Sequence, residues 1–125
     1  FEYGGRPVAY DVAMAAGIAY VDRLGVPAIA AHARALAAAL RDGLGRVPGA
    51  CLCSPDDPAL AAGIVTVALD GVDGVTAAAV LRERWRIVTR AALRGTSVRV
   101  SLAPFVEEGD VACLLESLAT LAAGR

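Results

Sequence analysis

The stretch Ile64–Leu69, with the sequence IVTVAL, decides how the rest of the chain is interpreted. Five of its six residues are apolar and three are β-branched aliphatic residues, which is typical of a buried strand. A continuous apolar run of this kind predicts a strand covered on both faces. An isolated pair of strands is not stable in water, so other segments must complete a sheet.

Three other segments are strand candidates. Residues 50–53 follow a turn at 47–49, while residues 86–90 and 97–102 are joined by a short connection that contains Arg and Gly. Helices are expected at 8–24, 27–46, 75–84 and 107–121, where apolar residues recur every three or four positions. The sequence therefore predicts an α+β fold, with two N-terminal helices followed by a β-β-α-β-β-α layer in which the helices pack on one face.

Residues 1–125 are expected to form a single domain, because no linker is long enough to divide them. Within it we distinguish an opening loop at 1–7, a helical part at 8–46 and a sheet-and-helix part at 47–125. The chain begins with Phe1, which is expected of a fragment or a processed product.

The composition excludes several classes of protein. Hydrophobic residues make up 57% and charged residues 20%, with a formal net charge of -1 and a mean hydropathy of +0.56. The 12 basic residues nearly balance the 13 acidic ones, so we expect neither a nucleic-acid partner nor a membrane partner. Apolar stretches are interrupted before the roughly 20 residues that a spanning helix needs.

The chain has three cysteines, Cys51, Cys53 and Cys113. An odd and sparse set indicates a reducing compartment, and we expect the protein to be cytoplasmic. Cys51 and Cys53 lack a second pair or a histidine at ligand spacing, so we interpret them as small apolar residues beside a short strand rather than as zinc ligands.

No segment forms an active site by itself. His32, the single histidine, lies between alanines, and the acidic pairs at 56–57 and 107–108 fit a solvated loop and a helix start. We therefore assign no catalytic residue and no metal ligand. The chain also contains no lysine, so no side chain can form a Schiff base with a carbonyl cofactor.

Two segments require explanation. The opening loop FEYGGRP at 1–7 mixes aromatic, charged and glycine residues ahead of a helix. In VRVSLAPF at 98–105, Arg99 interrupts an apolar strand, which is costly unless the guanidinium is paired or solvated. Its planar fork of donors suits a substrate carboxylate, although a strand with one exposed face would also accommodate it.

Together these segments resemble a known family. FEYGGRP at 1–7, two alanine-rich helices, RVSLAPF at 99–105 and a helix that starts EEGD at 107–110 are similar to the C-terminal part of class V aminotransferase-fold enzymes. These fold type I enzymes use pyridoxal 5′-phosphate and include cysteine desulfurases, isopenicillin N epimerase-like proteins and C-S lyases. The resemblance covers the whole chain and implies the small C-terminal domain of such an enzyme.

The resemblance also implies roles for particular residues. Arg99 would bind the substrate α-carboxylate, and Arg90 corresponds to the substrate-side arginine that precedes a His-Cys-Ala loop in desulfurases. Gly4 and Gly5 stand where the family has a Gly-Thr pair that reaches the cofactor phosphate of the neighbouring subunit, here without the threonine hydroxyl. The loop at 91–96 contains no cysteine, so a desulfurase nucleophile is not found there.

The expected function is that of the C-terminal portion of a pyridoxal-phosphate enzyme acting on an amino acid, of the epimerase, C-S lyase or transaminase type. The cofactor lysine would come from another domain or chain, in a homodimer or heteromer, and this chain would not be active alone. The alternative is a detached, non-catalytic interaction or ligand-binding module of the same fold. A third interpretation is an unrelated sheet-and-helix domain without a ligand.

Overall fold

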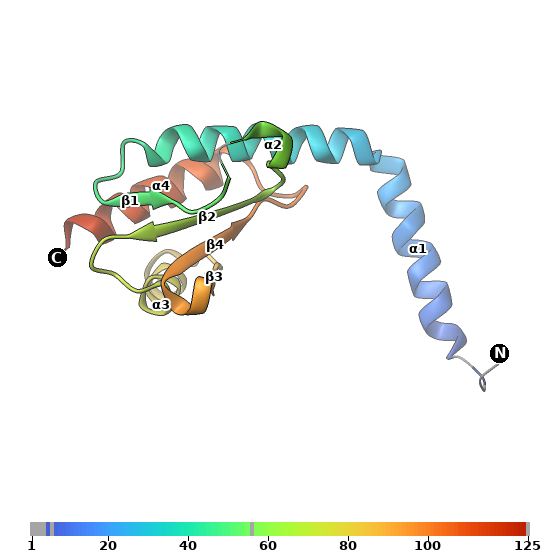
Figure 1. Cartoon of the computed structure of the whole chain (residues 1–125). Helices are drawn as coiled ribbons and strands as arrows, with labels where there is room; N and C mark the ends of the chain where they lie inside the picture. The colour runs from blue at the N-terminus through green and yellow to red at the C-terminus, as the bar shows by residue number, and fades with distance from the viewer. Residues whose placement is uncertain (1–4, 6, 56, 125) are drawn as a thin grey trace.

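The computed structural model describes residue 5 and residues 7–55 and 57–124. Within these ranges the chain forms an α+β fold, as predicted (Figure 1). The helices are α1 (Val8–Leu24), α2 (Val26–Leu44), α3 (Gly74–Trp85) and α4 (Glu108–Ala123). The strands are β1 (Ala50–Leu52), β2 (Ile64–Leu69), β3 (Arg90–Ala92) and β4 (Ser97–Ser101).

The four strands form one antiparallel sheet in the order β1-β2-β4-β3. Its centre is the pairing of β2 with β4, where Val65 lies opposite Val100 and Val67 opposite Val98. These four valines are buried and point to the same face. Alternation along each strand therefore gives the sheet one buried apolar face and one outer face of mixed polar and apolar residues.

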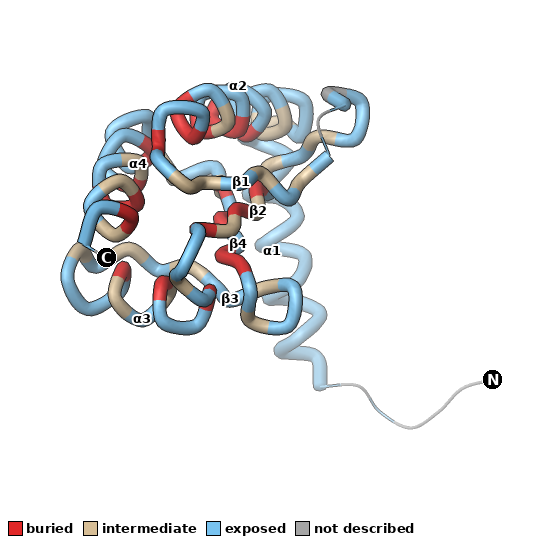
Figure 2. The backbone as a smooth tube through the Cα atoms, turned by 60° about the vertical axis from the view of Figure 1, so that its left-hand side comes forward, coloured by how far each residue is buried: buried red, intermediate tan, exposed pale blue. Residues whose placement is uncertain are grey.

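Helices α2, α3 and α4 contribute to the core that covers the apolar face (Figure 2). Each supplies a leucine with no exposed surface, respectively Leu40, Leu81 and Leu118. The prediction that β2 is covered on both faces is wrong within this chain. Ile64 is exposed and the next two residues on that face are half-buried, because the helices pack on one side of the sheet only.

The third strand differs from its predicted position at 86–90. Helix α3 ends in a left-handed (αL) cap, in which the Arg86 N–H donates to the Arg82 carbonyl and the Ile87 N–H donates to the Leu81 carbonyl. Arg86 adopts the left-handed conformation (φ 61°) that this ending requires. Since residues 86 and 87 complete the helix, pairing with β4 begins only at Arg90. The usual glycine signal for such an ending is absent.

Helix α1 has no buried residue. Gly25, with φ 81°, redirects the chain between α1 and α2, which are bent by 70° relative to each other. No single helix in the described ranges is long and apolar enough to cross a membrane; α1 and α2 satisfy a length and composition test only as this bent pair.

The first turn of α3 packs directly on β4, which gives a stability prediction. A Cβ atom at Gly74 would overlap the Ser97 carbonyl oxygen and lie 2.7 Å from the Ser97 nitrogen. We expect Gly74→Ala to lower the free energy of unfolding by about 2–3 kcal/mol, because backbone atoms must move. Gly17→Ala is the control, since nothing lies within 4 Å of its Cβ position. Equal urea midpoints for both variants would contradict this packing.

Asp73 caps the N-terminus of α3 and generates a pH prediction. Its carboxylate accepts hydrogen bonds from the Thr76 hydroxyl (2.6 Å) and from the Thr76 and Val75 N–H groups (2.9 and 3.0 Å). The Thr76 hydroxyl is the main reason that the pKa of Asp73 lies below its ordinary 3.8. The stabilisation is therefore present above that value and is lost as pH falls through the folded-state pKa.

We expect Asp73→Asn to lower the melting temperature at neutral pH, and the difference from the parent protein to shrink below about pH 4. Thermal unfolding across this range measures it. Asp70→Asn is a matched control, because its side chain makes no hydrogen bond among the described residues. A difference that grows on acidification would contradict the assignment.

Candidate substrate-binding site

The outer face of the sheet, which points away from the helical core, is the candidate site. On β4 the core face holds Val98 and Val100, while Arg99 and Ser101 alternate to the outer face and are exposed. None of the four strands contains an aspartate or glutamate. An arginine on this face therefore has no acidic partner on the strands themselves.

Arg90 and Arg99 are directly opposite each other in the β3–β4 register. Both side chains are exposed, and neither makes a hydrogen bond or ion pair with any described residue. Like charges at directly opposite positions are unfavourable in an antiparallel sheet. Two free guanidinium groups here are chemically suited to an anion, because a carboxylate can accept paired hydrogen bonds from such donors.

Arg99 is flanked by Arg90 on β3 and, on its other side, by a residue of β2. Thr66 is its partner on β2, and the Cys53 N–H donates to the Thr66 carbonyl at 2.8 Å just beyond the end of β1. We call Cys53, Thr66, Arg99 and Arg90 the outer row. Sequence analysis selected the two arginines but not Cys53 or Thr66. Alternation could have placed each residue on a face, whereas the register that aligns them appears only in the structure.

Gly5, the described glycine of the opening loop, is not brought to the outer row. Gly4 lies outside the described residues, and Gly5 is exposed with nothing within 4 Å of its Cβ position. Figure 1 places the start of α1 far from the sheet. Gly5, the described member of the predicted cofactor-binding pair, therefore does not share a site with Arg90 and Arg99 within one copy of this chain.

The loop after β4 is held by contacts from two helices. The Nε2 atom of His32 on α2 lies 2.9 Å from the Val106 carbonyl, as a donor in the Nε2–H tautomer. Glu107 and Asp110 form a capping box at the start of α4. Just before these contacts in the chain, Phe105 is 84% exposed. The loop that follows the outer row is thus fixed at its base and presents an aromatic ring to solvent.

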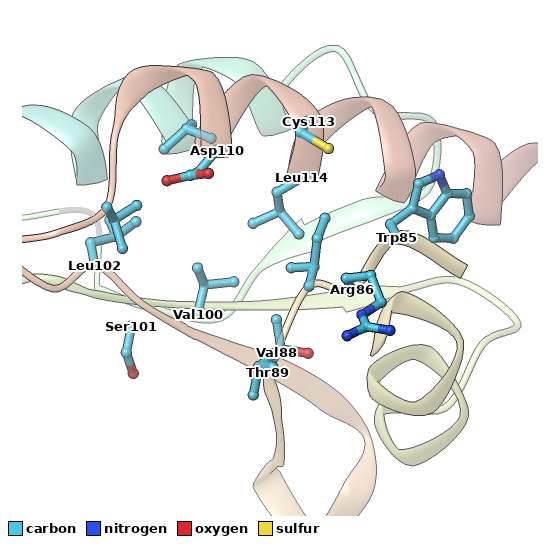
Figure 3. Close-up of a pocket in the computed structure, with 13 residues that line it drawn as sticks. Trp85, Arg86, Val88, Thr89, Val100, Ser101, Leu102, Asp110, Cys113 and Leu114 are labelled. Carbon is cyan, nitrogen blue, oxygen red and sulfur yellow. The ribbon is translucent and has the colours of Figure 1, made fainter. Parts of the chain in front are cut away.

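A hollow of about 390 Å³ lies near the core between the 85–89 segment, the end of β4 and α4 (Figure 3). It forms because residues 86–89 leave the edge of β4 before pairing starts at Arg90. Its acidic group, Asp110, accepts the Glu107 N–H at 2.9 Å and thereby serves the helix cap. The hollow is mainly apolar and is separate from the outer row.

Comparison with known proteins identifies the family. The sequence model for Aminotransferase class-V matches residues 1–114. The chain belongs to the class V aminotransferase family. No curated protein matches it in sequence.

Solved structures share the fold. A cysteine desulfurase from Thermococcus onnurineus NA1 is 23% identical, with a TM-score of 0.91 over 100% of this chain and 34% of that one. The cysteine desulfurase CsdA from Escherichia coli is 22% identical, with a TM-score of 0.84 over 99% and 32%. The cystine C-S lyase C-DES, solved with its reaction product cysteine persulfide, is 25% identical, with a TM-score of 0.56 over 64% and 20%. The chain thus spans about a third of the two desulfurases, whose match confirms the small-domain fold.

Proposed function

We propose that this chain is the C-terminal, substrate-binding portion of a pyridoxal-phosphate enzyme that acts on an amino acid. The observation that carries the proposal is the pair of unpartnered arginines, Arg99 and Arg90, on an acid-free sheet face in a member of the class V family. Arg99 would bind the α-carboxylate through two parallel hydrogen bonds. Arg90, directly opposite, would supply the second positive charge.

The residues of this chain suit the substrate more than the cofactor. Pyridoxal phosphate supplies an electron sink for reactions at an amino acid. Its covalent anchor is a lysine amine, and the chain has no lysine. Open space around Gly5 allows backbone N–H groups to approach a phosphate, with Gly4 beside it in sequence. A lysine-bearing domain or chain would therefore hold the cofactor, and this portion would not be active alone.

The surface of α1 supports a larger assembly. Its exposed apolar side chains are distributed around the helix rather than confined to one stripe. They are Val8, Tyr10, Val12, Met14, Ile18, Tyr20, Val21 and Leu24. A helix that is hydrophobic all round is normally buried. We propose that α1 packs against the lysine-bearing part or a second copy, and that this contact lets the opening loop of one copy reach a cofactor in another.

The segment between β3 and β4 bears on the reaction type. Residues 93–95 form a single tight turn, in which Leu93 and Arg94 adopt positive φ values of 46° and 58°. This connection is short and contains no cysteine. It supports a reaction of the epimerase, C-S lyase or transaminase type over one that needs a sulfur-accepting cysteine in this loop.

One experiment separates the enzyme from a detached module of the same fold. The native protein should be isolated and its mass and visible absorbance recorded. A species that carries a lysine-bearing segment and the visible absorbance of bound pyridoxal phosphate supports the enzyme. A colourless species of this chain alone would favour the non-catalytic module.

Substitution of Arg99 tests the substrate role. In the cofactor-loaded assembly, Arg99→Ala should raise KM for the amino-acid substrate about 10- to 100-fold, because hydrogen bonds to a charged group are lost. Steady-state kinetics measure the effect. Arg34→Ala on α2 is the control, since Arg34 is exposed and far in sequence from the outer row. An unchanged KM and kcat for Arg99→Ala would reject the carboxylate assignment.

A further inference from the structure

We infer that Cys53 is a reactive thiol that exchanges with small disulfides carrying a carboxylate, such as the disulfide of a thiol amino acid. The inference rests on the proposed carboxylate role of Arg99. The sequence pattern around Cys53 predicts only a structural residue, so a covalent site there is new. The observation behind it is the outer row, which places one thiol and two free guanidinium groups on a single line across the sheet.

Hydrogen bonds on both sides fix the position of Cys53. Its N–H donates to the Thr66 carbonyl at 2.8 Å, and the Thr66 N–H donates to the Ser54 hydroxyl oxygen at 2.8 Å. The preceding residue, Leu52, packs against the core, so alternation directs Cys53 to the outer face. The residue is exposed, and its thiol donates only a weak hydrogen bond to the Cys51 carbonyl at 3.5 Å. The thiol is therefore accessible on the face that carries the arginines.

The separation suits an amino-acid disulfide. Cys53 and Arg99 are two strand spacings apart, or about 10 Å between Cα atoms. Thr66, between them, is small, and its hydroxyl makes no hydrogen bond with a described residue. Arg99 has a long flexible stem, and the ligand itself separates its carboxylate from its sulfur by the α and β carbons. A ligand held by Arg99 can thus extend over Thr66 and present sulfur to Cys53.

Cys51 provides an internal comparison. It lies two residues before Cys53 on the same strand face and is also exposed. Its partner across the sheet is Ala68, so it is not in the line that contains Arg99 and Arg90. The two thiols therefore lie on the same face near the end of β1, and both are exposed to solvent. They differ because only Cys53 lies in line with Arg99 and Arg90.

The reaction is balanced without any further reagent. The Cys53 thiolate attacks one sulfur of the ligand disulfide, the ligand S–S bond breaks and a Cys53–S bond forms. The other half of the ligand leaves as a thiolate and takes up the proton that Cys53 released. The protein thiol is oxidised to a mixed disulfide, and half of the ligand is reduced to a thiol. The ligand disulfide is the oxidant.

Two variants, each with one remaining cysteine among residues 1–125, test the inference in the assembled protein. Cys51→Ser with Cys113→Ser retains Cys53, whereas Cys53→Ser with Cys113→Ser retains Cys51. Each is treated with 3,3′-dithiodipropionate or with neutral hydroxyethyl disulfide, and peptide mass analysis follows adduct formation at the remaining cysteine. We expect the ratio of the rate with the dicarboxylate to that with the neutral reagent to be about tenfold higher for Cys53 than for Cys51. Equal ratios would overturn the inference.

Arg99→Gln and Arg90→Gln, each placed in the Cys53-only protein, complete the test. Either change should lower the Cys53 preference for the dicarboxylate, and two variants guard against one that folds poorly. If the preference survives in both folded variants, the inference is wrong, even where Arg99→Gln raises KM for the substrate. If the preference falls while KM is unchanged, the thiol site is supported and the proposed function fails.

Discussion

The antiparallel pairing of β2 with β4 is the interaction on which the rest of the structure depends. Val65 and Val67 on one strand meet Val100 and Val98 on the other, and this register assigns every strand residue to one of two faces. The buried face recruits α2, α3 and α4 because apolar surface gains free energy when it leaves water. Since a slip of one residue would move all these side chains to the other face, the core itself maintains the register.

The same pairing leaves the outer face with a chemical character of its own. Arg99 is turned outward by the alternation that buries its two neighbours, and β3 then places Arg90 directly opposite. The two arginines have no acidic partner on the strands. Like charges at opposed positions are unfavourable in a sheet. Because opposed like charges do not stabilise a sheet, this pair supports the proposed site for an anion.

A second surface is incomplete in a different way. The apolar residues of α1 are exposed around the helix, while α2 changes along its length from exposed to buried. The core is therefore satisfied by α2 onward, and α1 extends from it without packing of its own. The family model matches residues 1–114, and the chain spans about a third of the two desulfurases. The exposed apolar surface of α1 agrees with a domain that contacts further protein.

Local pattern and family resemblance determined much of this protein from sequence. Helical periodicity located all four described helices, and the resemblance selected Arg99 and Arg90. The predicted position of the third strand is wrong because the left-handed helix ending at Arg86 has no glycine to signal it. Only the tertiary structure aligned Cys53 and Thr66 with the arginines, since that line depends on register between strands distant in sequence. Register is set by the packing of the whole core, whereas the periodicity of a helix is a local property of the chain.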